Sequence, residues 1–125
     1  MEKLINCNII VHIEYIELIS GSNQFFEVLF LSKSKEKFKI VFDSVWDLRC
    51  SIENGYIDRF SKFIRNTEQE SSILLIENSE NLKYFENQIS GTLPMDNIKN
   101  YILFDAVDTI VEVLTIKEPT LIRML

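Results

Sequence analysis

The stretch FFEVLFLSKSKEKFKIVF, residues 25–42, decides the fold class that the sequence predicts. Residues 24–33 are almost continuously apolar, which is typical of a central strand covered on both faces. Residues 37–42 alternate between apolar and charged side chains, as a half-buried strand does. A polar turn at residues 32–36 joins the two runs, so the stretch predicts two adjacent antiparallel strands.

A further strand is expected ahead of this pair. Residues 6–15 alternate with a period of two, with Cys7, Ile9 and Val11 in the apolar phase. Residues 20–23 consist of turn-forming residues. Three successive strands with short turns predict an antiparallel meander.

After Asp43 the apolar spacing fits a helix better than a strand. We expect a helix over residues 55–65 and leave residues 44–54 unassigned. Residues 73–77 predict a short buried strand. A second helix is expected to begin at the N-cap residue Ser79 and to end at Gly91.

The C-terminal part predicts two strands at residues 98–106 and 109–116, with Pro119 stopping the last one. The order is then β-β-β-α-β-α-β-β. This order predicts a single α+β domain over residues 1–125, with a largely antiparallel sheet of about six strands and helices packed on one face.

The charge balance bears on partners and location. The formal net charge is −6 and the sequence pI is about 4.8, whereas a nucleic-acid-binding protein usually carries a basic stripe. We therefore expect no direct nucleic-acid contact; the acidity fits either a basic protein partner or simple solubility. The N-terminus lacks the pattern of a signal peptide, and no apolar run approaches the length of a membrane helix, so a cytoplasmic protein without membrane contact is expected.

No cofactor or metal is expected either. Cys7 and Cys50 match no metal-binding spacing; free buried thiols are favoured, and a disulfide stays open. His12 is the only histidine and has no matched nucleophile. Loose groups of carboxylates could act as an acid and base pair or hold a hard cation, although turns also attract aspartate. We therefore predict that the protein is not an enzyme.

The segment from Trp46 to Arg49 is the leading candidate for a protein-binding surface, since tryptophan and arginine dominate interface hot spots. If the segment is helical, Arg49 and Glu53 are neighbours on one face and can form an ion pair, which is the structural alternative. The full candidate set joins this segment to the nearby acids and comprises Asp43, Trp46, Asp47, Arg49, Glu53, Asp105, Asp108 and Glu112.

Two parts of the sequence together resemble a known family. They are VFDSVWDLR at residues 41–49 followed by Ile52 and Glu53, and a combination of LIENS at 75–79, Tyr84 and Phe85, YILFD at 101–105, VEVL at 111–114 and Pro119. The combination resembles small bacterial immunity proteins of polymorphic-toxin and contact-dependent growth inhibition systems. The resemblance implies a non-catalytic protein that binds and neutralises a cognate toxin, often a basic nuclease domain, without a cofactor.

Two alternative functions are kept open. The apolar runs at residues 25–31 and 121–125 could cover a second subunit, which would make the chain a structural or regulatory homodimer. The carboxylates could instead serve a hydrolase, provided that at least two of them meet in one pocket.

Overall fold

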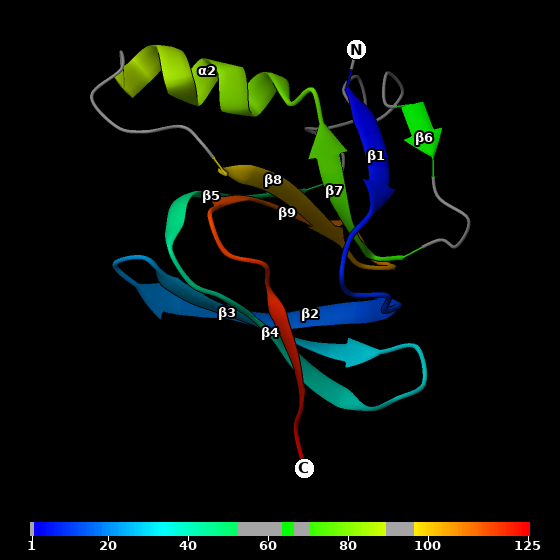
Figure 1. The fold of residues 1–125 in the computed structure, drawn as a ribbon. Coiled ribbons are helices and arrows are strands. Elements are labelled where there is room, and N and C mark those ends of the chain that lie inside the picture. The colour runs from blue at the N-terminus through cyan, green and yellow to red at the C-terminus, as the bar shows by residue number, and fades with distance from the viewer. Residues whose placement is uncertain (1, 53–63, 67–70, 90–96) are drawn as a thin grey trace.

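A computed structural model describes residues 2–52, 64–66, 71–89 and 97–125 of the chain. Strands make up most of these residues and form two sheets, with one helix among the described residues (Figure 1). The prediction of an α+β domain, with one sheet and helices packed on one face, is therefore wrong. The apolar runs pair over long range into two stacked sheets, which local spacing does not reveal.

The four-stranded sheet contains the predicted meander. Its strand order is β10-β4-β3-β2, and all neighbours are antiparallel. The strands are β2 (Ile13–Ser22), β3 (Phe25–Ser32), β4 (Lys37–Phe42) and β10 (Thr120–Arg123). The second and third strands of the predicted meander are confirmed, whereas the first, predicted at residues 6–15, overlaps β2 only from Ile13 to Tyr15, because residues 7–12 form no strand.

The first strand of the meander begins later than predicted. β2 starts at Ile13 and continues through Ser22, so the predicted turn at residues 20–23 moves to Asn23 and Gln24. Register shifts between Ile13 and Tyr15 and between Ile16 and Leu18 break the period of two. As a result Tyr15 is half exposed, although it shares the sequence phase of the buried Ile13.

β10 was missed, because Pro119 was expected to end the last strand. Proline cannot donate a hydrogen bond to a neighbouring strand, but it is tolerated immediately ahead of an edge strand. Thr120 onward pairs with β4 at the edge of the four-stranded sheet, and Leu121 packs against the core. The tail is thus part of the fold.

The six-stranded sheet has the order β5-β9-β8-β7-β1-β6. It is antiparallel except for the pair formed by β1 and β6. Its strands are β1 (Lys3–Asn6), β5 (Val45–Ile52), β6 (Ile64–Asn66), β7 (Ile73–Glu77), β8 (Lys99–Phe104) and β9 (Thr109–Thr115). The predicted strand at residues 73–77 and the predicted C-terminal hairpin are confirmed.

After Asp43, the described residues Val45–Ile52 form a strand, β5. β5 pairs antiparallel with β9, and its sequence VWDLRCSI alternates between apolar and polar side chains, a signal that the helical spacing obscured. The predicted helix at 55–65 falls mostly on residues outside the described part. Its last residues, from Ile64, belong to β6 and not to a helix, so the prediction is wrong there.

The second predicted helix is observed as α2 (Glu80–Ile89). The amide of Leu82 donates to Oγ of Ser79 over 2.9 Å, which confirms Ser79 as the N-cap. The hydroxyl of Ser79 lies 2.6 Å from Oδ1 of the buried Asn100 on β8, so the cap also ties the helix to the six-stranded sheet. The predicted end at Gly91 lies outside the described residues.

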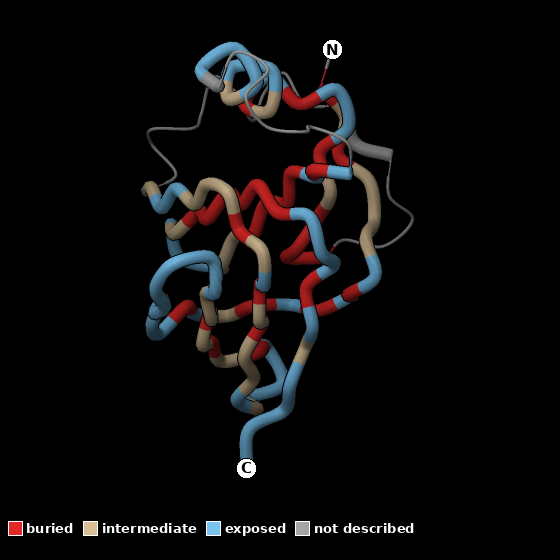
Figure 2. The backbone as a smooth tube through the Cα atoms, turned by 60° about the vertical axis from the view of Figure 1, so that its left-hand side comes forward, coloured by how far each residue is buried: buried red, intermediate tan, exposed pale blue. Residues whose placement is uncertain are grey.

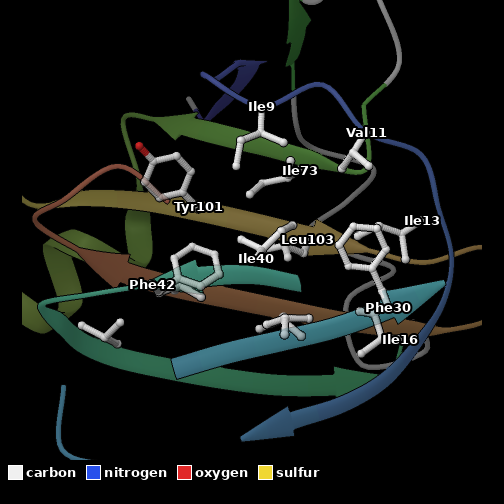
Figure 3. Packing of buried hydrophobic residues seen from close by; sticks show 14 residues of the cluster. Ile9, Val11, Ile13, Ile16, Phe30, Ile40, Phe42, Ile73, Tyr101 and Leu103 are labelled. Carbon is white, nitrogen blue, oxygen red and sulfur yellow. The ribbon is translucent and has the colours of Figure 1, made fainter. Parts of the chain in front are cut away.

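The main core fills the space between the two sheets (Figure 3). Phe30, Ile40 and Phe42 of the four-stranded sheet meet Tyr101 and residues of β7, β8 and β9. A smaller cluster covers the other face of the six-stranded sheet, on the side of α2; it consists of Leu4, Leu74, Ile76, Ile102 and Ile110. Figure 2 shows the buried positions concentrated in the middle of the molecule, whereas the C-terminal end is exposed.

The buried phenol of Tyr101 makes stability depend on alkaline pH. Burial raises the pKa of Tyr101 to about 12, and the charges of Cys7 and Glu118 add to the shift. Because this folded-state pKa lies above the unfolded value of about 10, the associated stability is complete below pH ~10 and is lost as the pH rises through ~12.

We expect the free energy of unfolding to fall by ~2 kcal/mol across this range through Tyr101. Urea titrations at a series of alkaline pH values measure the fall. Tyr101→Phe keeps the ring in the core and should lose less stability over the same interval. Equal pH dependence of the two proteins would contradict the assignment to this phenol.

Candidate functional site

The eight candidate residues do not form a single surface. In the ladder between β5 and β9, Val45 faces Thr115 and Ile52 faces Thr109. Asp43 and Asp47 therefore lie near one end of the ladder, and Asp105 and Asp108 lie just beyond the other end. At the rise per residue of a β-strand, the two ends are ~20 Å apart. Glu53 lies outside the described residues.

The carboxylate of Asp105 stabilises the fold by accepting hydrogen bonds from backbone amides. Its Oδ1 accepts hydrogen bonds from the amides of Val107 and Thr109, both at 3.0 Å, and its Oδ2 accepts from the amide of Ile16 at 3.1 Å. The carboxylate thus shapes the hairpin between β8 and β9 and ties it to β2, which is the usual role of aspartate in a turn. Asp108 is exposed on the same hairpin.

Glu112 is buried in the centre of β9, with 1% of its surface exposed. The side-chain amide of Asn81 donates to its Oε2 over 2.6 Å. Because Asn81 lies in the first turn of α2, this bond holds the helix on the sheet. Glu112 is therefore not available as a surface contact.

Asp43 stands where the chain passes from one sheet to the other. Its Oδ1 accepts from the amide of Ser44 at 2.8 Å, and its Oδ2 lies 3.3 Å from Nζ of Lys117. Ser44 adopts a left-handed backbone (φ 59°), and the hydroxyl of Thr115 donates to the carbonyl oxygen of Asp43 over 2.7 Å. These contacts fix the bend between β4 and β5.

Arg49 joins β5 to α2. Its Nε lies 3.0 Å from Oδ2 of Asp47, and its guanidinium carbon lies 6.0 Å from the centroid of the Tyr84 ring. Alternate residues of a strand share a face, so Asp47 and Arg49 are neighbours in β5 without any helix. Arg49 is half exposed and the Tyr84 side chain is exposed, so both are accessible.

Trp46 lies next to this pair at an irregularity in the register of β5. Its indole nitrogen is buried and has no hydrogen-bond acceptor within the described residues. A buried donor without a partner costs about 1 to 3 kcal/mol. Trp46 and Asp47 line an open hollow of about 250 Å³, whose other walls are Asn23, Phe26, Val45 and Leu48.

Three residues therefore form one accessible cluster, which we name the β5 surface: Asp47, Arg49 and Tyr84. Trp46 is not part of it, since it lines the hollow together with Val45 and Leu48, which pack against the core. Two of the three residues belong to the candidate set that the sequence indicates. Tyr84 was not in that set, because only the folded chain brings α2 alongside β5. The sequence shows only that Tyr84 is an aromatic residue outside the apolar positions Leu82, Phe85 and Ile89 of the predicted helix.

A second hollow, of about 120 Å³, brings His12 and Asp105 to the same place, together with Lys33, Ser71 and Ser72. Both oxygens of Asp105 are engaged by backbone amides, as described above. The carboxylates of the candidate set that the structure describes, which exclude Glu53, thus lie apart or are engaged by the fold. Among these described carboxylates there is no converging pair of the kind that a carboxylate-dependent hydrolase needs.

Both cysteines are free thiols. Burial raises the pKa of the Cys7 thiol, whereas Cys50 is exposed on β5 and departs from the expectation of a buried residue. Within the described ranges, no group of three histidine, cysteine or acidic side chains is placed to hold a metal ion. No helix of the described residues is long and apolar enough to cross a membrane.

Comparison with known proteins finds no matching family, no matching curated protein and no matching solved structure.

Proposed function

We propose that this chain is a binding protein of the immunity type, which neutralises a toxin-like partner protein by direct contact through the β5 surface. The observation that carries the proposal is the arrangement of Arg49 between Asp47 and the ring of Tyr84. Tryptophan, tyrosine and arginine are the residue types that contribute most to binding energy at protein interfaces. The segment at residues 41–49, which resembles immunity proteins, includes two members of the same cluster, Asp47 and Arg49.

The geometry suits recognition because the guanidinium is already oriented. Its ion pair with Asp47 and its contact with Tyr84 restrict the rotamers of Arg49, so less side-chain entropy is lost when a partner binds. Trp46 and Asp47 also line a neighbouring hollow of about 250 Å³ that a partner side chain could enter.

The net charge of this chain indicates which kind of partner protein it attracts. With a formal net charge of −6, the chain attracts a basic protein at long range. Electrostatic steering of this kind raises the association rate and is screened by salt. A basic nuclease domain, acting without any cofactor supplied by this chain, is the partner that the proposal favours.

Replacing Arg49 with alanine is expected to weaken binding of the partner by about 30-fold, the loss of ~2 kcal/mol that a central arginine typically contributes. The partner is first isolated by affinity capture on the tagged wild-type chain. Titration calorimetry then compares the wild type with the variant. Growth assays test neutralisation: the partner alone should arrest cells, and co-expression of the wild-type chain should restore growth.

Arg123→Ala is the matched control, because Arg123 also forms one ion pair, with Glu36 at 2.7 Å, and is exposed on the other sheet. Its removal takes away the same charge and should leave the affinity unchanged. A captured partner that does not arrest growth would contradict neutralisation. Equal affinity of the wild type and the Arg49 variant would contradict the β5 surface.

A further inference from the structure

The outward face of the four-stranded sheet is unusually apolar. Antiparallel sheets with one face in water normally alternate apolar inward and polar outward residues. β3 departs from this rule, since Val28 and Phe30 point into the core and Phe25, Leu29 and Leu31 point outward. The nearly continuous apolar sequence of β3 predicted cover on both faces, yet Phe25 retains 45% exposure.

The neighbouring strands extend this apolar surface. The cross-strand register places Tyr15 opposite Leu31 and Leu18 opposite Leu29. The side chains of Tyr15, Leu18 and Ile122 remain 50%, 53% and 40% exposed. We name this surface the outer face; it consists of Tyr15, Leu18, Phe25, Leu29, Leu31, Val41 and Ile122.

The charges on the outer face lie in two rows of opposite sign. The acids Glu17 and Glu27 come from β2 and β3, and the bases Lys37 and Lys39 come from β4. They pair within the chain, with 3.8 Å between Glu17 and Lys37 and 3.2 Å between Glu27 and Lys39. These four charges cancel, whereas the chain as a whole is strongly acidic.

We infer that the outer face binds a second copy of this chain, through face-to-face packing of two four-stranded sheets. A two-fold axis in the interface, parallel to the strands, reverses the strand order, so that β3 of one copy lies over β4 of the other and β2 lies over β10. Glu27 of β3 then lies over the strand that carries the bases Lys37 and Lys39. Two copies can approach on this balanced face without the repulsion between their net charges, whereas a basic partner would gain no attraction from it.

The area of the outer face indicates how tightly two copies should bind. The four strands have ten, eight, six and four residues and lie about 4.8 Å apart, so the face spans ~450 Å² per copy, and stacked sheets lie ~10 Å apart. An interface of this size is at the lower end of the range for specific complexes. A dissociation constant in the micromolar range is therefore expected.

The test is sedimentation velocity of the full chain at concentrations of roughly 1 to 100 μM, which bracket that constant. The wild type should shift from its monomer mass of 14.7 kDa to twice that mass. Leu18→Glu buries an unpaired carboxylate from each copy and should weaken the dimer by at least ~30-fold. Because Leu18 is half exposed, the variant should keep the circular dichroism spectrum of the wild type and, at sub-micromolar protein where both are monomeric, its unfolding midpoint.

Val107→Glu is the matched control, since Val107 is an equally exposed aliphatic residue, at 60%, on the hairpin of the other sheet. It should dimerise like the wild type. If Leu18→Glu does not fold, Ile122→Glu tests the same face from β10. A wild type that stays monomeric throughout, outer-face variants that still dimerise, or a Val107 variant that dissociates equally would each overturn the inference.

Discussion

Phe30→Ala is expected to lower the free energy of unfolding by ~3 to 5 kcal/mol, the usual cost of removing a buried aromatic side chain. Phe30 is 1% exposed at the centre of β3, and its ring stacks on that of Phe38 at 5.7 Å. It fills the space between the sheets beside Ile13 and Ile16 (Figure 3). Its removal leaves a cavity that two hydrogen-bonded sheets cannot close by moving together.

Urea unfolding, followed by the fluorescence of Trp46, measures this loss, because Trp46 is the only tryptophan in the chain. Phe25→Ala is the control: it changes the same residue type in the same strand, but on the outer face, where the side chain is 45% exposed. At sub-micromolar protein, below the dissociation constant expected for the dimer, it should cost much less than Phe30→Ala. Similar losses for the two variants would contradict the inward orientation of Phe30.

Gly21→Ala is expected to cost ~3 kcal/mol or more, since the backbone conformation and the close packing both require glycine. Gly21 has a φ of 155° and lies opposite Phe26 near the turn between β2 and β3. A Cβ atom there would clash with the carbonyl oxygen of Phe25 and lie 2.7 Å from Cα of Phe26. The clash is with backbone, so a change of side-chain rotamer cannot relieve it.

The same urea titration compares Gly21→Ala with Ser20→Ala, an exposed neighbour in β2. The Ser20 variant should be close to the wild type. A Gly21 variant that is as stable as the wild type would contradict this prediction. The hairpin would then have to reach the same register with a different backbone at this position.

Parts of the candidate site were predictable from local sequence. Trp46, Asp47 and Arg49 stood out by residue type, and two of them share an ion pair that strand spacing alone brings together. The pairing expected between Arg49 and Glu53 assumed a helix; Arg49 lies in β5, and its observed partners are Asp47 and Tyr84. Tyr84 could not be assigned in advance, because its neighbour Arg49 lies in a different element, far away in the sequence.

The three C-terminal acids of the candidate set also could not be placed from local sequence. Asp105, Asp108 and Glu112 are close in sequence and were grouped for that reason. In the fold, Asp105 caps a hairpin, Asp108 is exposed on it, and Glu112 is buried beneath α2. Successive residues of a strand point to opposite faces, so a short distance in sequence does not give a shared surface.

By itself the sequence determined the elements whose signals are local: the hairpin of β3 and β4, the strand β7, the C-terminal hairpin and the N-cap at Ser79. A period of two, a turn or a capping hydroxyl depends only on neighbouring residues. Only the tertiary structure decided that the strands divide between two sheets, that β5 is a strand, that β10 follows Pro119 and that Arg49 meets Tyr84. Each of these depends on pairing and burial between segments far apart in the chain, and the free energy of such contacts exceeds local preference.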